Sequence, residues 1–232
     1  MHCSISLFRY PASSIVWALS QMQLAHRHLK KAPGLQFYKL MGSGAGNGFS
    51  LWPNWRVYSL LGVWESEAAH QDFWQHNPFA LAAQRRAEEQ LRVHLRPLRT
   101  HGTWDGVNPF TDRLSEQPLR PEQAVAVLTR ARVRTQRLPE FWRHVPGSSA
   151  SLEGRPGLKL QIGVGETPLI YQATFSVWDN FEAVQQFAYR DKAHGEVVRK
   201  TRDRNWYAED MFTRFAVEGI EGTWSGRKGE DF

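Results

Sequence analysis

The stretch from Asp191 to Phe215, DKAHGEVVRKTRDRNWYAEDMFTRF, sets one histidine among arginines and acidic residues. On a helix, Val198 and Arg202 would follow His194 at i+4 and i+8 and lie near its face. An imidazole beside small aliphatic side chains suits a planar apolar ligand. The guanidinium groups of Arg199 and Arg202 match carboxylates at the edge of such a ligand in geometry. This spacing makes His194 a candidate metal or cofactor ligand.

Spacing alone leaves two interpretations of His194 open. The first is a working ligand, whose second imidazole nitrogen Glu196 or Glu209 would orient, as metal-bound histidines usually require. The second is a surface histidine on a charged, solvated helix, which spacing by itself slightly favours.

The other histidines show no metal-ligand spacing. His26 and His28 are two residues apart, so they diverge on a helix, and His70 and His76 are six apart. Neither pair has the His-x-x-x-His spacing that puts two ligands on one helix face. A mononuclear zinc or non-haem iron site is therefore not expected.

A glycine-rich stretch, GSGAGNGF from Gly42 to Phe49, invites a nucleotide-binding interpretation but does not support it. The third glycine of G-x-G-x-x-G would fall at Asn47, no Gly-Lys-Ser/Thr follows, and the next element is expected to be a strand. The stretch is instead typical of a flexible loop between two strands, which at the mouth of a barrel would be placed to gate a cavity.

Composition places the chain among globular proteins. It has 232 residues, 41% of them hydrophobic, with 10 Trp, one Cys and a net charge of +6. The single Cys3 excludes a disulfide framework. We find no signal peptide and no apolar run of about 20 residues, so a cytoplasmic protein is expected. The scattered cations argue against nucleic acid as a partner and are compatible with an acidic partner or an anionic membrane surface.

The chain contains an internal repeat. PGLQFYKL at residue 33 resembles PGLKLQIG at residue 156, and 156 − 33 = 123. The apolar strands ending at Trp64 and Trp178 are 114 residues apart, and the GTW triplets ending at Trp104 and Trp224 are 120 apart. The matches keep their order, which indicates a duplicated unit of about one hundred residues.

Each repeat predicts the element order βαββαβ. In the first, alternating strands (4–10, 35–41, 55–64 and 92–104) flank helical segments at 13–31 and 66–91, and the second repeats this order. This is the split-βαβ pattern of ferredoxin-like folds. We therefore expect an α+β fold of two tandem ferredoxin-like units forming a pseudo-twofold dimeric α/β-barrel.

The expected organisation is a first unit at 1–105, a linker at 106–123, a second unit at 124–225 and a mobile tail at 226–232. Aligning the repeats on Trp64 and Trp178 places Ala80 opposite His194, since 194 − 114 = 80. The histidine belongs to the second unit alone, as expected when one copy of a duplication carries a site.

Six stretches together resemble the spheroidene monooxygenase family of carotenoid ketolases. They are WALSQMQLA, PGLQFYKLMGSGAGNGF, FWRHVPG, IGVGETPLIYQATFSVW, AHGEVVRKTRDRNWYAEDMF and the closing GTW. They span nearly the whole chain in order. The resemblance implies a haem-containing monooxygenase that uses O2 to form a keto or hydroxy group at the C-2 end of a linear carotenoid. It also implies a dimeric α/β-barrel whose haem iron is bound by a helical histidine.

Transferred to this chain, the resemblance makes His194 the iron ligand. Val198, Arg199 and Arg202 would complete the haem site, with the arginines near the propionates. It further implies an external electron donor of the ferredoxin type, peripheral contact with the membrane that holds carotenoids, and compatibility with a homo-oligomer. If His194 is not the ligand, His76, His94 and His144 are the next candidates.

A long polyene substrate requires an apolar, aromatic-lined channel. The candidates for its lining are Trp17, Phe37, Trp55, Phe175 and Trp178, although core packing is the commoner role for each. Arg56 and Gln172 are the candidate distal polar residues. Two alternatives stay open: a haem-binding or haem-degrading barrel without carotenoid oxygenation, and a cofactor-free barrel monooxygenase.

Overall fold

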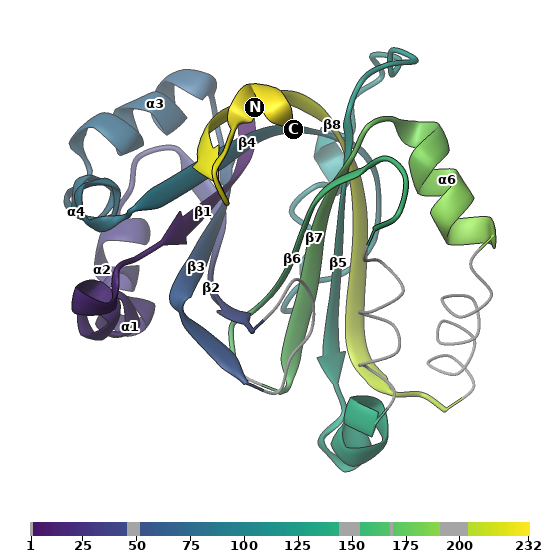
Figure 1. Cartoon of the computed structure of the whole chain (residues 1–232), viewed down its shortest axis with the longest axis horizontal. Helices are drawn as coiled ribbons and strands as arrows, with labels where there is room; N and C mark the ends of the chain where they lie inside the picture. Colours follow the sequence, from purple (N-terminus) through teal and green to yellow (C-terminus); the bar gives the residue numbers. More distant parts are fainter. Residues whose placement is uncertain (1, 46–51, 144–153, 168, 191–203) are drawn as a thin grey trace. The chain divides into compact units, whose positions relative to one another are not determined.

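The protein has an α+β fold, as the repeat pattern predicts. The computed structural model describes residues 2–45, 52–143, 154–167, 169–190 and 204–232 (Figure 1). The chain divides into two compact units. Unit 1 comprises Met1–Ser43, Asn54–Arg96 and Glu218–Phe232, and unit 2 comprises Gly44–Pro53 and Pro97–Val217.

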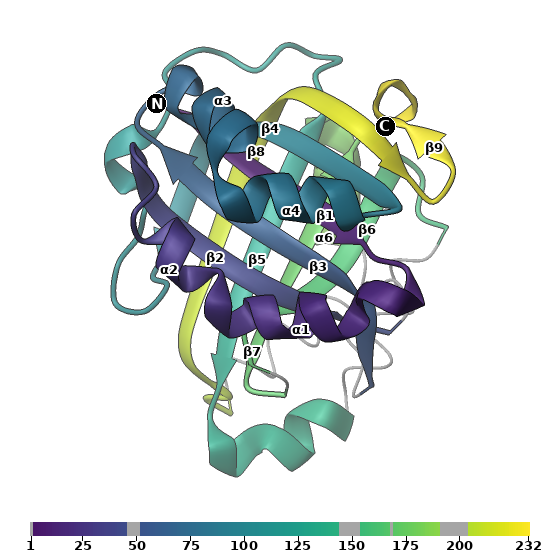
Figure 2. The same ribbon diagram turned by 90° about the vertical axis from the view of Figure 1, so that its left-hand side faces the viewer.

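Unit 1 contains a four-stranded antiparallel sheet in the order β4-β1-β3-β2. Its strands are β1 (His2–Arg9), β2 (Leu35–Gly44), β3 (Pro53–Trp64) and β4 (Glu89–Gly102). Its helices are α1 (Ile15–Leu24), α2 (His26–Leu29), α3 (Glu67–His76) and α4 (Pro78–Arg86). The chain order is therefore the predicted βαββαβ, and the helices lie over one face of the sheet (Figure 2).

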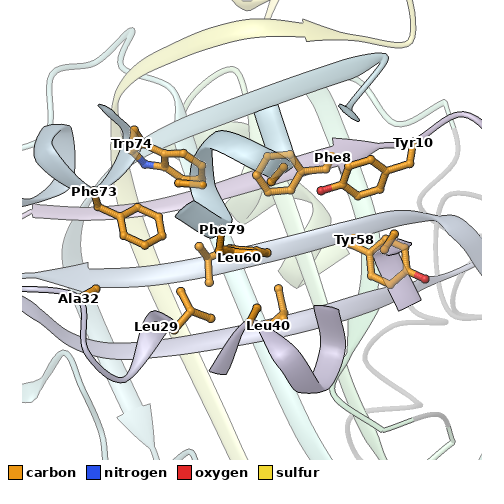
Figure 3. Close-up of a cluster of buried hydrophobic side chains, with 14 of the residues drawn as sticks. Phe8, Tyr10, Leu29, Ala32, Leu40, Tyr58, Leu60, Phe73, Trp74 and Phe79 are labelled. Carbon is orange, nitrogen blue, oxygen red and sulfur yellow. The ribbon is translucent and has the colours of Figure 1, made fainter. Parts of the chain in front are cut away.

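The core of unit 1 forms where that helical layer meets the sheet (Figure 3). Phe8 of β1, Tyr10 directly after β1 and Leu60 of β3 pack in one buried cluster with Trp74 of α3 and Phe79 of α4. Alternation along β1 sends Ile5 and Leu7, also buried, to the opposite face. Both faces of this sheet are therefore apolar.

Unit 2 repeats the order. Its elements are β5 (Val125–Val133), helical residues 138–143, β6 (Leu158–Gly165), β7 (Tyr171–Trp178), α6 (Phe181–Arg190) and β8 (Tyr207–Trp224). The sheet order is β6-β7-β5-β8, with β5 antiparallel to both β7 and β8. Two ferredoxin-like units thus follow one another along the chain.

The repeat holds at the level of single backbone turns. Gly34 before β2 and Gly157 before β6 have φ values of 70° and 79°, in the left-handed region that favours glycine. A Cβ on Gly34 would lie 2.6 Å from Cβ of Ala69, and one on Gly157 would lie 2.7 Å from Cβ of Ala183. The same close approach of turn and helix occurs in both units, at the two offsets found in the sequence.

The helix starts after β3 and β7 are equivalent as well. Ser66 caps α3 by accepting a hydrogen bond from Ala69 N at 3.1 Å. In unit 2, Asn180 accepts from Ala183 N at 3.0 Å in the same position. Different residue types therefore meet the same need of the orphan N–H groups.

Each GTW triplet leads into a tight hairpin turn. The central residues Asp105 and Gly106 have φ values of 54° and 80°, and Ser225 and Gly226 have 53° and 76°. Two consecutive positive φ values are typical of a type I′ turn. The final turn pairs β8 with β9 (Arg227–Lys228), so residues 226–232, expected to be a mobile tail, form a hairpin strand and a short 3-10 helix.

The ends of the two repeats lie in each other's unit. The turn at 224–227 ends the second repeat but belongs to unit 1, where Gly226 N donates to Glu89 at 3.0 Å. The turn at 104–107 ends the first repeat but belongs to unit 2, where Gly106 N donates to Glu209 at 2.8 Å.

Two local expectations are wrong. The second helical segment was extended to residue 91, but α4 ends at Arg86 and β4 begins at Glu89. The alternating burial of Leu91, Val93 and Leu95 shows why the strand period prevails there. The first helix begins later than residue 13, because a 3-10 turn at Ala12–Ser14 precedes α1.

Candidate functional site

The residues predicted to hold a cofactor lie outside the described part of the chain. These are His194, Val198, Arg199 and Arg202, together with Glu196 and the alternative ligand His144. Their roles therefore stay predictions. Ala80, the residue aligned with His194, is fully buried in α4.

Other predicted site residues are already engaged in unit 1 contacts. Arg56 Nε donates to the carbonyl oxygen of Tyr10 at 2.8 Å, and its guanidinium pairs with Glu88. His76 is 68% exposed and pairs with Asp72 at 2.9 Å, which is the geometry of a surface helix pair. The structure gives neither residue a place in an enclosed site.

The aromatic residues predicted to line a channel divide into two groups. Phe175 and Trp178 are buried at 0% and 2% exposure, and Trp178 packs against Phe187 of α6. Trp55 is 50% exposed, and Trp17 lies edge-on to Tyr10 at the border of the unit 1 core. Packing against α6 therefore accounts for Trp178.

Three histidines that spacing could not connect meet in unit 1. We call His2, His70 and His94 the histidine cluster. They come from β1, α3 and β4, and one potential ligand nitrogen from each lies within 4.8 Å of the other two. His94 Nδ1 and His2 Nε2 are 3.0 Å apart. The signal that could have joined two of them is a shared face of the sheet. Ser4 of β1 pairs with His94 of β4, and His2, two residues before Ser4, lies on the same face as Ser4.

The neighbours of the histidine cluster fix the tautomers of two rings. Glu221 Oε1 lies 3.1 Å from His94 Nε2 and, as a carboxylate, accepts its proton. Trp74 Nε1, a donor only, donates to His70 Nε2 at 2.9 Å. Arg92 completes the surroundings, lying 4.0 Å over the Trp74 ring and 3.4 Å from Glu221.

Burial favours the neutral form of two of these histidines, His70 and His2. It lowers the pKa of His70 to about 2, and the nearby His2, Arg92 and His94 act in the same direction. Burial and His94 also lower the pKa of His2, against the opposing effect of Glu67. Neutral imidazole is the form that binds metal ions.

Unit 2 holds a buried arginine network on β5. The Arg130 side chain is 1% exposed and forms ion pairs with Glu209 and, at 3.2 Å, with Asp105. Its guanidinium also lies 5.4 Å from the ring centres of Trp104 and Tyr171, within cation–π range. We call these five residues the Arg130 network.

Glu209 is committed to this network and is therefore not free to orient another histidine. Burial alone would raise its pKa, but hydrogen bonds from Gly106 N–H, Arg130 and Thr103 lower it to about 2. Thr103 Oγ1 and Gly106 N each donate to Glu209 at 2.8 Å. The carboxylate therefore stays ionised and joins the hairpin turn to β5.

The amino-acid sequence is similar to characterised enzymes along almost its full length. It is 40% identical over 225 residues to spheroidene monooxygenase of Rhodobacter capsulatus. This alignment covers 97% of this chain and 93% of that protein. It is 33% identical to the Cereibacter sphaeroides enzyme of the same name, over 97% of this chain and 69% of that protein. The chain belongs to the spheroidene monooxygenase family. A third family member, from Rubrivivax gelatinosus, is 37% identical over 84% of this chain and 74% of that protein. No family model matches the sequence.

Solved structures of other proteins resemble this chain in fold. Aldoxime dehydratase superposes with a TM-score of 0.62 over 93% of this chain and 80% of that protein, at 11% identity. A second aldoxime dehydratase structure, in complex with butyraldoxime, gives 0.61. At this identity the likeness shows a shared fold and nothing about the reaction.

Two of the cluster histidines leave no room for a haem between them, because His2 Nε2 and His94 Nδ1 are only 3.0 Å apart. In unit 2, His101 stacks on Phe212 with ring centres 5.4 Å apart. The haem prediction therefore continues to depend on His194, outside the described residues.

Proposed function

We propose that this protein is a monooxygenase that introduces oxygen from O2 into a carotenoid. One observation carries the proposal: 40% identity over 97% of the chain to spheroidene monooxygenase of Rhodobacter capsulatus. Each hydroxylation inserts one oxygen atom into a C–H bond. Two electrons from an external donor and two protons reduce the other atom to water. Two hydroxylations at one carbon give a gem-diol, which loses water to leave a ketone.

The proposed substrate is a linear carotenoid, oxidised at its C-2 end to a keto or hydroxy product. The proposed donor is a ferredoxin-type protein, and the net charge of +6 is compatible with an acidic donor. The substrate is long and apolar, so the chain must offer it an apolar surface and exclude water from the oxidised carbon.

We further propose a haem bound through His194, with Val198 beside it and Arg199 and Arg202 near its propionates. Bound haem would supply the iron at which O2 is activated. The chain's own share would be the axial imidazole and the guanidinium groups that neutralise the two carboxylates. This assignment is supported by the family membership and the residue pattern from residue 194 to residue 202.

Peripheral membrane contact is proposed through α1. No helix among the described residues is long and apolar enough to span a membrane. However, α1 exposes Val16 at 82%, Leu19 at 48% and Leu24 at 46%. Exposed cations follow at Arg27 and Lys30. An apolar helix face bordered by cations is typical of helices that bind anionic interfaces.

One reconstitution tests the main proposal. The protein, purified from haem-supplemented cells, is supplied with a linear carotenoid, O2, a ferredoxin and its reductase, and the products are separated by mass. A gain of one oxygen atom, labelled from 18O2, is expected. Haem binding without a labelled product would favour a haem-binding or haem-degrading protein, and labelled product from colourless protein would favour a cofactor-free oxygenase.

The ligand assignment has its own measurement. Wild-type protein is expected to show a Soret band that is lost or shifted in His194→Ala. His76→Ala serves as the matched control, because His76 is an exposed helix residue paired with Asp72. An unchanged spectrum in His194→Ala would contradict His194 as the ligand.

A further inference from the structure

The histidine cluster occupies a place that the second repeat fills differently. His2 pairs with Trp64 across β1 and β3, and Val125 pairs with Trp178 across β5 and β7. Since Trp64 and Trp178 are equivalent, Val125 is the counterpart of His2.

The other two histidines also have counterparts without an imidazole. Counting four residues from the equivalent caps Ser66 and Asn180 gives His70 in one helix and Val184 in the other. The offset of 120 between the GTW triplets places Arg214 opposite His94.

In unit 2, this place is ordinary apolar core. Val125, Val184 and Trp178 pack in one buried cluster, and the Arg214 guanidinium lies 4.0 Å over the ring of Phe181. The βαββαβ fold therefore needs no histidine between this sheet and its helix. Packing alone does not explain why unit 1 carries three of them.

We propose that His2, His70 and His94 bind one first-row transition-metal dication, zinc being the ion that three neutral imidazoles suit well. Two nitrogens that bind one ion at about 2.0–2.1 Å lie about 3–3.4 Å apart. His2 Nε2 and His94 Nδ1 are 3.0 Å apart, which is close to that separation. The ion takes the place of the proton between the two rings, and His2 changes tautomer, so that its one proton moves from Nε2 to Nδ1 by exchange with water and both imidazoles stay neutral.

The surroundings of His94 support metal binding. The Glu221 carboxylate, 3.1 Å from His94 Nε2, keeps the proton on that nitrogen. The lone pair of Nδ1 then faces His2 Nε2. Metal-binding histidines almost always donate their second ring N–H to such a carboxylate or carbonyl. Glu221 also offsets part of the charge that the ion and Arg92 bring to the site.

His70 joins the other two by exchanging one partner. Its Nε2 accepts a hydrogen bond from Trp74 Nε1 at 2.9 Å, so the lone pair of that nitrogen is occupied. A ligand nitrogen of His70 already lies within 4.8 Å of those of His2 and His94, so loss of the Trp74 hydrogen bond or a change of tautomer would make a His70 lone pair available to the ion. His94 is 16% exposed, so water can reach the site and complete a tetrahedral set.

Zinc binding to the whole, tag-free chain tests the proposal. After dialysis against a chelator, the wild-type protein is expected to bind one zinc ion per chain by calorimetry and elemental analysis. His2→Gln and His94→Gln are each expected to weaken binding by more than about 100-fold, and Glu221→Gln by about 10-fold. His26→Gln and His76→Gln, which change partly or largely exposed histidines of the same unit, are the matched controls and should bind as wild type.

Substituted Co2+ gives a second readout that is independent of oxygenase activity. A tetrahedral visible spectrum is expected for wild type and not for His94→Gln, with near-ultraviolet circular dichroism confirming that both are folded. Absence of stoichiometric zinc in wild type would overturn the proposal and leave a hydrogen-bonded histidine cluster only. Undiminished zinc binding in both His2→Gln and His94→Gln would overturn it as well.

Discussion

Arg130 carries a positive charge almost fully removed from water. Two carboxylates and two aromatic rings surround its guanidinium, and this arrangement offsets the cost of desolvation. A buried ion pair contributes little net stability compared with apolar packing, but breaking one leaves an uncompensated charge. Substituting a single residue of the Arg130 network is therefore expected to cost much more free energy of unfolding than the intact network contributes.

Arg130→Met is expected to lower the free energy of unfolding by about 3–5 kcal/mol, because it leaves the Glu209 carboxylate, whose side chain is only 13% exposed, without its cation. Arg9→Met is the matched control. Arg9 pairs with Glu89 at 2.7 Å, but the two side chains are 30% and 20% exposed, so a loss of about 1 kcal/mol is expected. Urea denaturation measures both, and equal losses would contradict the role of burial.

Glu209 also predicts how stability responds to acid. Its pKa is about 2 in the folded protein and near 4.5 in the unfolded chain, so only the unfolded chain takes up a proton between these values. Its contribution to stability is fully present above about pH 4.5 and is lost as the pH falls toward 2. Glu209→Gln should flatten this part of the stability curve in urea titrations from pH 6 to pH 3. A curve as steep as that of wild type would contradict the assignment.

The histidine cluster shows where residue patterns lose predictive power. His2, His70 and His94 are separated by 68 and 24 residues, so no local spacing joins them. Their meeting depends on the register of β1 against β4 and on the face that α3 turns to the sheet. The second repeat carries Val125 and Val184 at the positions of His2 and His70, so a residue-by-residue comparison of the repeats reveals the change to histidine but not that the histidines meet.

At the scale of elements, the turns before β2 and β6 set how closely each helix approaches its sheet. Gly34 and Gly157 combine a positive φ with a neighbouring Ala Cβ that a new methyl group would strike. Gly154 also has a positive φ of 70°, but a Cβ there would meet nothing within 4 Å. The three positions therefore separate backbone strain from steric overlap.

Gly34→Ala and Gly157→Ala are each expected to destabilise the protein by about 2–4 kcal/mol, from backbone strain and overlap together. Gly154→Ala should cost about 1 kcal/mol, because strain acts alone. Thermal unfolding at matched concentrations measures the three. A loss in Gly154→Ala as large as in the other two would mean that overlap with the helix is unimportant.

Element types were predictable wherever an apolar period or a cap was strong. Ser66 marked the start of α3, and the repeated Gly-Leu and Gly-Thr-Trp segments marked equivalent turns. Element ends were less predictable. The composition of residues 87–91 predicts a continuation of α4. Pairing with β1 instead places Glu89 and Leu91 in a strand. Tertiary pairing, which the local sequence does not contain, decides such positions.

At the scale of the whole molecule, each of two long strands begins in one unit and ends in the other. β4 runs from unit 1 into unit 2 at Arg96–Pro97, and β8 runs from unit 2 into unit 1 at Val217–Glu218. The sequence repeats therefore have different boundaries from the compact units, and neither repeat contains all of a unit.

The fragment 1–105 is accordingly expected not to fold cooperatively. It lacks Glu218–Phe232, and with it the Gly226 N–H that binds Glu89 and the Glu221 carboxylate beside His94. Near-ultraviolet circular dichroism and urea denaturation of the purified fragment measure this. A sharp transition with native-like aromatic signals would show that the first repeat is self-sufficient.

The hairpin that ends each repeat belongs to the compact unit of the other repeat, and this has a consequence for how such a chain assembles. A single repeat expressed as its own polypeptide could complete its unit only with the last strand of a second molecule. Such an association becomes less favourable as the protein is diluted. Joining the copies through residues 106–123 makes that exchange an event within one molecule, governed by an effective concentration that dilution cannot lower. One copy can then change its side chains without the other, and the three histidines of unit 1 opposite Val125, Val184 and Arg214 are differences of this kind.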